Sequence, residues 1–156
     1  MQRCLGAESL LLAAASEKVV SVRTTAMLQG AVFHLYAAYL LHLREIAANY
    51  AYTDAQEIST IQQLVDVLGK QDKVAAEGSE MARLIEDRNS WLAKCLTAYW
   101  QCLDGPVGQT VQISHAGIDL RQENLPESTP AIGDVETWLA AMLELFDRHR
   151  ALMYEY

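Results

Sequence analysis

The chain has 156 residues, of which 51% are hydrophobic and 21% charged, a composition typical of one globular domain and unlike that of disordered chains. Its formal net charge is −8 and its basic residues are scattered, which argues against binding to nucleic acid or to anionic membranes. We therefore expect residues 1–156 to form a single soluble domain.

Two helices are predicted in the first third of the chain. Leu5, Leu12 and Val19 fall on one stripe of a first helix over residues 3–21. A second helix over residues 25–49 has two different faces. Its bulky face carries Leu28, Val32, Leu35, Tyr39, Leu43, Ile46 and Tyr50. Its small face carries Gly30, Ala31, Ala37, Ala38 and Ala48. Small side chains let a neighbouring helix approach closely, so this helix is predicted to have neighbours on both sides.

Residues 26–43 are the best candidate for a membrane span. They contain Gln29, His34 and His42, and charged residues follow at once, which favours a buried core helix over a span. The N-terminal apolar run is short and lacks a convincing cleavage site, so no signal peptide is predicted. Cys4, Cys95 and Cys102 contain no CxxC pair and are interpreted as free thiols in a reducing compartment, which predicts a cytoplasmic protein.

The later elements are shorter or interrupted. Thr53 followed by Gln56 has the spacing of a capping box and predicts a short third helix that ends at Gly69. Helical patterning over residues 79–103 predicts a mostly buried helix, with a possible break at Asn89 and Ser90. Asp134 is predicted to cap the last helix, whose apolar arc consists of Val135, Trp138, Leu139, Met142, Leu145, Phe146, His149 and Met153.

Residues 105–133 form the one long irregular connection. Four apolar residues in it are predicted to pin it across the outside of the protein: Val111, Ile113, Ile118 and Leu120. Taken together, the patterns predict an all-α fold. We expect an antiparallel helical bundle of four main helices plus one short helix, with a long loop before the last helix.

Histidines are the natural candidates for metal binding or acid–base chemistry. Di-iron bundles need a Glu-x-x-His motif on each of two helices, whereas this chain has the reversed order, His42-x-x-Glu45, once. His34 and Glu45 share a face but lie about three turns apart, too far to chelate one ion. His149 falls in the apolar arc of the last helix, so it is expected to be neutral and hydrogen-bonded to another helix.

Catalytic motifs are not apparent. In the HEPN superfamily of ribonucleases, an Arg is followed four to six residues later by His, but the positions after Arg88-Asn89 that should offer His do not. A nucleophile elbow, a P-loop and a dinucleotide fingerprint are also missing from the sequence. We therefore predict no catalytic residue, no cofactor and no metal ligand. Trp100 lies at the edge of its helix's apolar arc and is a candidate interface residue.

Two stretches together resemble a known family. They are residues 31–36 with 43–47 (AVFHLY and LREIA), and residues 89–92 with 148–155 (NSWL and RHRALMYE). The chain is similar in these to a family of small uncharacterised proteins from Pseudomonas and related gammaproteobacteria, known only as a domain of unknown function. The resemblance implies a helical cytoplasmic bacterial protein and transfers no catalytic residue.

The sequence thus favours a non-enzymatic helical-bundle protein that acts through protein–protein contacts and self-associates as a homo-oligomer. The alternative is a bundle that binds a small molecule or a metal ion in a pocket between the second and last helices. The residues of that pocket would be His34, Glu45 and His149, with Tyr36 or Tyr39 nearby.

Overall fold

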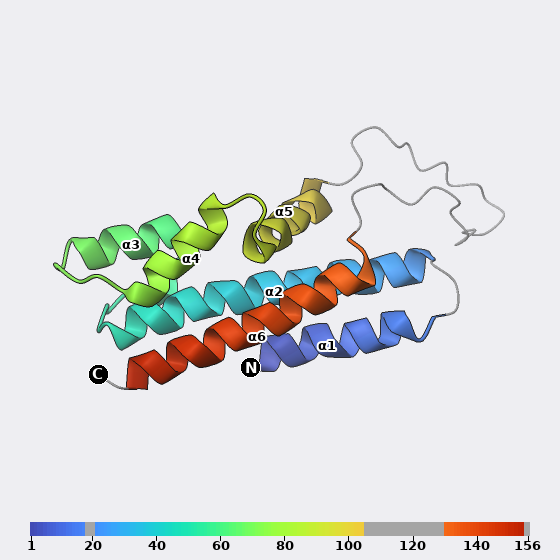
Figure 1. Ribbon diagram of the computed structural model, residues 1–156, viewed down its shortest axis with the longest axis horizontal. Coiled ribbons are helices and arrows are strands. Elements are labelled where there is room, and N and C mark those ends of the chain that lie inside the picture. Colours follow the sequence, from blue (N-terminus) through green and yellow to red (C-terminus); the bar gives the residue numbers. More distant parts are fainter. Residues whose placement is uncertain (18–20, 105–129, 155–156) are drawn as a thin grey trace.

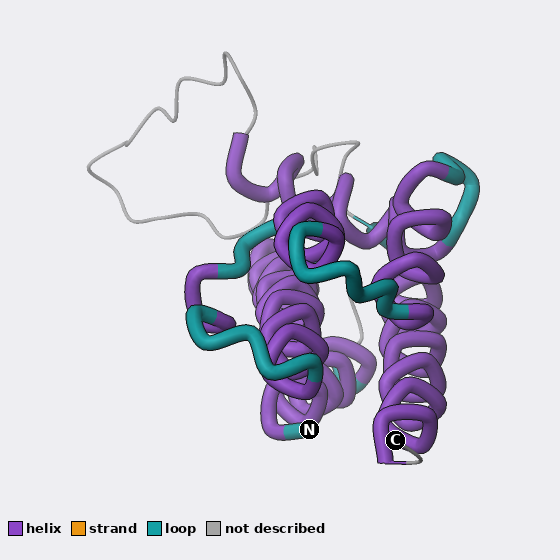
Figure 2. Tube along the Cα trace, turned by 90° about the vertical axis from the view of Figure 1, so that its left-hand side faces the viewer, coloured by secondary structure: helices purple, strands orange, loops and turns teal. Residues whose placement is uncertain are grey.

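The computed structural model describes residues 1–17, 21–104 and 130–154 (Figure 1), and within these ranges every regular element is a helix. The elements are α1 (Gln2–Ala15), α2 (Val22–Asn49), the 3₁₀ turn η1 (Ala55–Glu57), α3 (Ile61–Gly69), α4 (Ala76–Glu86), α5 (Trp91–Asp104) and α6 (Ile132–Tyr154). Figure 2 accordingly shows only helices and loops among the described residues. The prediction of an all-helical protein is confirmed for these ranges.

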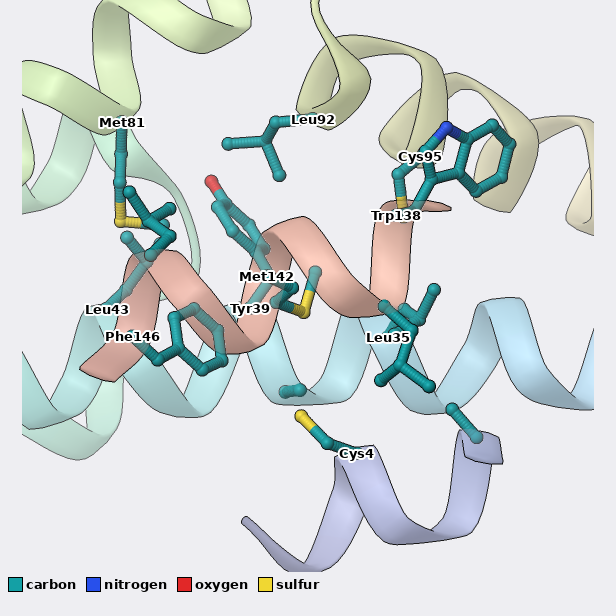
Figure 3. Packing of buried hydrophobic residues seen from close by; sticks show 14 of the residues in the cluster. Cys4, Leu35, Tyr39, Leu43, Met81, Leu92, Cys95, Trp138, Met142 and Phe146 are labelled. Atoms are coloured by element: carbon teal, nitrogen blue, oxygen red, sulfur yellow. The ribbon is translucent and has the colours of Figure 1, made fainter. Parts of the chain in front are cut away.

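Helix α2 is the central element, because it contacts every other helix. Six of the seven residues of its bulky face are buried as predicted, from Leu28 at 4% exposed to Ile46 at 0%, and Tyr50 is half-buried. In Figure 3, side chains from α1, α2, α4, α5 and α6 meet around this face, with Met81 and Cys95 on one side and Cys4 on the other. The predicted apolar arc of α6 packs into the same core, and all eight of its residues are buried.

Helix α1 packs against α2 through small residues, and the predicted stripe of leucines is wrong. Leu5 and Leu12 are 56% and 68% exposed, whereas the buried face consists of Cys4, Ala7, Leu11 and Ala14. The small face of α2 explains this choice, because two small surfaces allow a close approach that leucines would prevent. A Cβ atom added at Gly6 would lie 2.8 Å from Cε1 of His34 on α2.

Helix boundaries follow capping groups that the sequence only partly indicated. The predicted start at Thr53 is wrong, because α3 begins at Ile61 and the Thr60 hydroxyl accepts the Gln63 N–H at 3.1 Å. Thr60 and Gln63 have the same spacing as Thr53 and Gln56, the pair on which the prediction rested. The break predicted near Asn89 and Ser90 is present, since α4 ends at Glu86 and the Ser90 hydroxyl accepts the Ala93 N–H at 3.0 Å.

The start of α6 also differs slightly from its prediction. Asp134 lies in the first turn, not at the cap position, and its carboxylate accepts the Ala131 N–H at 3.3 Å. The expected anchors Val111, Ile113, Ile118 and Leu120 lie outside the described residues.

The close approach at Gly6 generates a stability prediction. Gly6→Ala should lower the free energy of unfolding by about 1 kcal/mol or more, because the new methyl group displaces the His34 ring. In a His34→Ala background the same change should raise it by about 1 kcal/mol, the helix preference of alanine over glycine. Urea denaturation followed by circular dichroism measures both values. Stabilisation in both backgrounds would contradict the packing described.

The end of α2 generates a second prediction. Ala51 has a φ of 58°, and the bonds from Tyr52 N to Ala47 O and from Ala51 N to Ala48 O close a Schellman motif there. Because alanine is strained in this conformation and glycine is not, Ala51→Gly should raise the free energy of unfolding by about 1 kcal/mol. The matched control is Ala48→Gly, an exposed position inside the helix, which should lower it by up to about 1 kcal/mol. Equal losses from both changes would rule out the strain.

Candidate functional site: a buried histidine pair

Two histidines from distant parts of the chain meet in the core. His42 of α2 and His149 of α6 are 1% and 0% exposed, and Nε2 of His42 lies 3.0 Å from Nδ1 of His149. The two helices run in the same direction, which places their C-terminal halves side by side (Figure 1). The imidazole rings are nearly parallel, at 18°, and the His42 ring also stacks on Phe146 at 4.0 Å.

Each histidine uses its other ring nitrogen to contact a carboxylate. Nδ1 of His42 lies 2.9 Å from Oε2 of Glu45, and Nε2 of His149 lies 3.0 Å from Oε2 of Glu80 on α4. The four side chains form a continuous chain of hydrogen bonds, Glu45–His42–His149–Glu80, which we call the histidine network. Its middle is buried, whereas the side chains of its two carboxylates are 38% and 40% exposed.

The two carboxylates are held by arginines that flank His149 in the sequence. Arg150 donates two hydrogen bonds to Glu45, at 2.8 and 3.0 Å, and Arg148 donates one to Glu80 at 2.5 Å. Successive helical residues point about 100° apart. When His149 points into the core, Arg148 and Arg150 therefore point to either side of it. One turn of α6 is thereby tied to both α2 and α4.

Burial and pairing shift the pKa values of this group. Burial lowers the pKa of His42 to about 4, although the hydrogen bond to Glu45 opposes the shift. Burial raises the pKa of Glu45, but the bonds from Arg150 and His42 outweigh it and leave that pKa below its usual value. The pKa of Glu80 is likewise lowered, because bonds from His149 and Arg148 outweigh its partial burial. Both carboxylates are therefore ionised at neutral pH.

A cleft of about 470 Å³ opens beside the Glu45 end of the network, between the start of α1 and helices α2 and α6. His42, Glu45 and Arg150 line it together with Arg3 and the apolar side chains of Leu41 and Phe146. A larger cleft of about 740 Å³ lies apart from the network, between the end of α2 and the start of α4. There the Tyr50 hydroxyl donates to the buried Glu77 carboxylate at 3.0 Å.

Of the four predicted pocket residues, the structure joins Glu45 and His149 through His42. His34 lies elsewhere, against Gly6 of α1, and its Nδ1 is buried without a hydrogen-bond partner among the described residues. Tyr39 is buried with its ring directed toward Leu92 (Figure 3), and burial raises its pKa to about 12. Tyr36, the alternative to Tyr39, lies on the surface formed by α2 and α5.

Sequence reasoning missed His42, Glu80 and the two arginines as members of one site. The His42-x-x-Glu45 spacing is that of a reversed metal motif, and it also places a carboxylate within reach of a buried imidazole. The Arg-His-Arg run at residues 148–150 was the other available signal, because two charges flank a residue of the apolar arc. Glu80 gave no signal, since its role depends on how α4 docks.

A second feature is an aromatic surface, defined here as Phe33 and Tyr36 of α2 with Tyr99 and Trp100 of α5. The rings of Tyr36 and Tyr99 stack at 3.7 Å, and Phe33 and Trp100 meet Tyr99 edge-on at 5.4 and 5.2 Å. Phe33 is 40% exposed and Trp100 54%. A groove of about 470 Å³ runs beside Trp100 and is lined by Ile85, Arg88, Ala93, Leu96 and Thr97.

The described residues also bear on metal binding and on membrane insertion. Within the part of the chain that the structure describes, no group of three or more His, Cys, Asp or Glu side chains is arranged to hold a metal ion. Helix α2 is long and apolar enough to cross a membrane, a property that it shares with the core helices of soluble proteins.

Comparison with known proteins gives a family and no function. No curated protein and no solved structure matches the chain. One family model does match, over residues 3–155, and therefore over nearly the whole sequence. The chain belongs to DUF6586, a family of unknown function.

Proposed function

We propose that the chain is a helical-bundle protein of the cytoplasm that works through protein contacts, and that its partner is a second copy of itself. The observation that carries this proposal is the aromatic surface. Soluble proteins rarely leave several adjacent aromatic rings exposed unless the rings contact a partner. Tyrosine and tryptophan are also the residues most enriched where a few side chains supply most of the binding energy.

An exposed ring next to a groove supports a two-fold interface. Such an interface uses the same patch on both subunits, so the patch must contain both a projecting group and the recess that receives it. Trp100 is 54% exposed, and it borders the groove lined by Ile85 and Leu96. In a symmetric dimer each Trp100 enters the groove of the other copy, where Arg88 supplies a cation for the indole ring.

Charge supports a salt-dependent association. None of the four residues of the aromatic surface is charged, so burying them in a dimer buries no ion pair. Each chain, however, has a net charge of −8, and two copies repel each other over longer distances. Salt screens this repulsion, so dimerisation should strengthen as the salt concentration rises.

Sedimentation equilibrium tests the proposal. The wild-type chain should dimerise at micromolar concentration, and Trp100→Lys should weaken the dimer by about 30-fold or more, as expected for the loss of a central aromatic residue. The matched control is Leu12→Lys, an exposed apolar residue of α1 at 68% exposure, which should leave the dimer unchanged. A wild-type chain that stays monomeric at about 100 μM, in low and high salt, would refute self-association.

The cleft beside Glu45 supports a second candidate function, the binding of a small organic acid. Two guanidinium groups, of Arg3 and Arg150, line this cleft against one carboxylate, and Leu41 and Phe146 offer an apolar wall. Because Arg150 is already paired with Glu45, Arg3 is the residue that would receive the ligand's carboxylate.

Thermal denaturation with benzoate as the probe tests this candidate. Millimolar benzoate should raise the melting temperature of the wild-type chain, and Arg3→Gln should abolish the increase. Benzylamine, which has the same ring and the opposite charge, is the control and should have no effect. Equal shifts with both compounds, or none with benzoate, would remove this candidate.

A further inference from the structure

We infer that the histidine network is a proton-binding site, which holds one proton more than two neutral imidazoles provide and thereby couples the stability of the fold to pH. The inference stands on the three hydrogen bonds of the network and concerns a different part of the molecule from the aromatic surface. It holds whether or not the chain dimerises.

The proton count follows from geometry. Three contacts link Glu45, His42, His149 and Glu80, at 2.9, 3.0 and 3.0 Å, and each needs one proton between its two heavy atoms. An ionised carboxylate has no proton to donate, and a neutral imidazole has one. The two imidazoles therefore supply two protons for three bonds. Without a third, two lone pairs would face each other in the core, a contact that buried polar groups avoid.

The third proton belongs to the histidine pair. Both carboxylates are ionised, because an arginine is bonded to each of them. With His42 as the neutral member, its Nδ1 donates to Glu45 and its Nε2 accepts from His149. His149 must then donate from both nitrogens, to His42 and to Glu80. The third proton thus makes the two rings an imidazole–imidazolium pair.

Charged groups from α4, α2, α6 and α1 surround the histidine pair. Helix α4 places Glu80 against it, and α2 places Glu45 one residue further along the network. On α6 itself the cations Arg148 and Arg150 are each paired with one of these carboxylates and also approach Glu144 and Asp147, at 3.5 and 3.8 Å. Helix α1 contributes Arg3 at the cleft and the thiol of Cys4, whose pKa is raised by burial.

The sign of the pH dependence follows from proton counting. Above about pH 7 an unfolded histidine is mostly neutral. The native network keeps its proton there, so folding takes up one proton and stability falls as the pH rises. For one proton, the unfolding equilibrium constant increases about tenfold per pH unit, until the native network itself loses the proton.

Nitrogen-15 NMR of the wild-type chain tests the inference directly. Long-range ¹H–¹⁵N spectra distinguish an imidazolium from either neutral tautomer. At about pH 8, where a free imidazole is neutral, one of the four histidines should still carry protons on both ring nitrogens. Its signals should be missing from His149→Phe. Four neutral histidines at this pH, or an imidazolium that persists in His149→Phe, would overturn the assignment.

The pH dependence of unfolding is the second arm. Between about pH 7 and 9 the unfolding constant of the wild-type chain should rise more steeply than that of His149→Phe. The difference should be about a factor of ten for each pH unit. His34→Gln is the matched control and should keep the wild-type slope, because His34 lies outside the network. Both variants retain the buried Cys4 and Cys95 thiols, whose raised pKa values give a slope of the same sign. Equal slopes in all three chains would contradict the inference, and should His149→Phe not fold, the wild-type spectrum decides alone.

Discussion

The hydrogen bond between His42 and His149 is the constraint on which the core of this protein depends. Two imidazoles at 0–1% exposure bring four ring nitrogens into a core that otherwise consists mainly of apolar side chains, Phe146 and Met142 among them. Each nitrogen without a partner would cost about 1–3 kcal/mol, so arrangements that satisfy all four are favoured. The arrangement found requires α2, α4 and α6 to keep their relative positions, because each contributes one or more members of the network.

The histidine network gives specificity at a place where apolar packing alone would give little. Leucine, alanine and methionine stripes are compatible with several offsets between two parallel helices, whereas a chain of three directional bonds is compatible with one. The arginines extend this effect to the surface: Arg148 and Arg150 hold the outer carboxylates in the orientation that the histidines need. In other helical proteins, buried polar groups of this kind fix the offset between neighbouring helices. We propose the same role for the histidine network in this chain.

The two faces of α2 pack against different parts of the molecule. The small face receives α1 at a distance that Gly6 and Gly30 make possible, and the bulky face builds the core with α6. Between them, Phe33 and Tyr36 meet Tyr99 and Trp100 of α5 at the surface.

The residues that could be predicted from the sequence were those whose environment is set by their own helix. The apolar faces of α2 and α6 are wide and regular in the sequence, so the buried residues of both helices could be predicted directly. Helix α1 offered two competing stripes, and the choice of Cys4, Ala7 and Leu11 over the leucines depended on the small surface opposite. His42 and His149 are 107 positions apart, and nothing local to either residue indicates that their rings meet. Glu80 is harder still, because its carboxylate matters only after α4 docks on α6.

A double-mutant cycle on the central hydrogen bond tests this account most directly. His42→Phe and His149→Phe should each lower the free energy of unfolding by about 1–3 kcal/mol at neutral pH, because each leaves a buried ring nitrogen facing a phenyl ring. The double variant replaces both partners by apolar rings of similar shape, so its loss should be clearly smaller than the sum of the two single losses. Urea denaturation gives all three values. Losses that simply add would mean that the two histidines do not act as a pair, and the network would then not be the interaction that sets the fold.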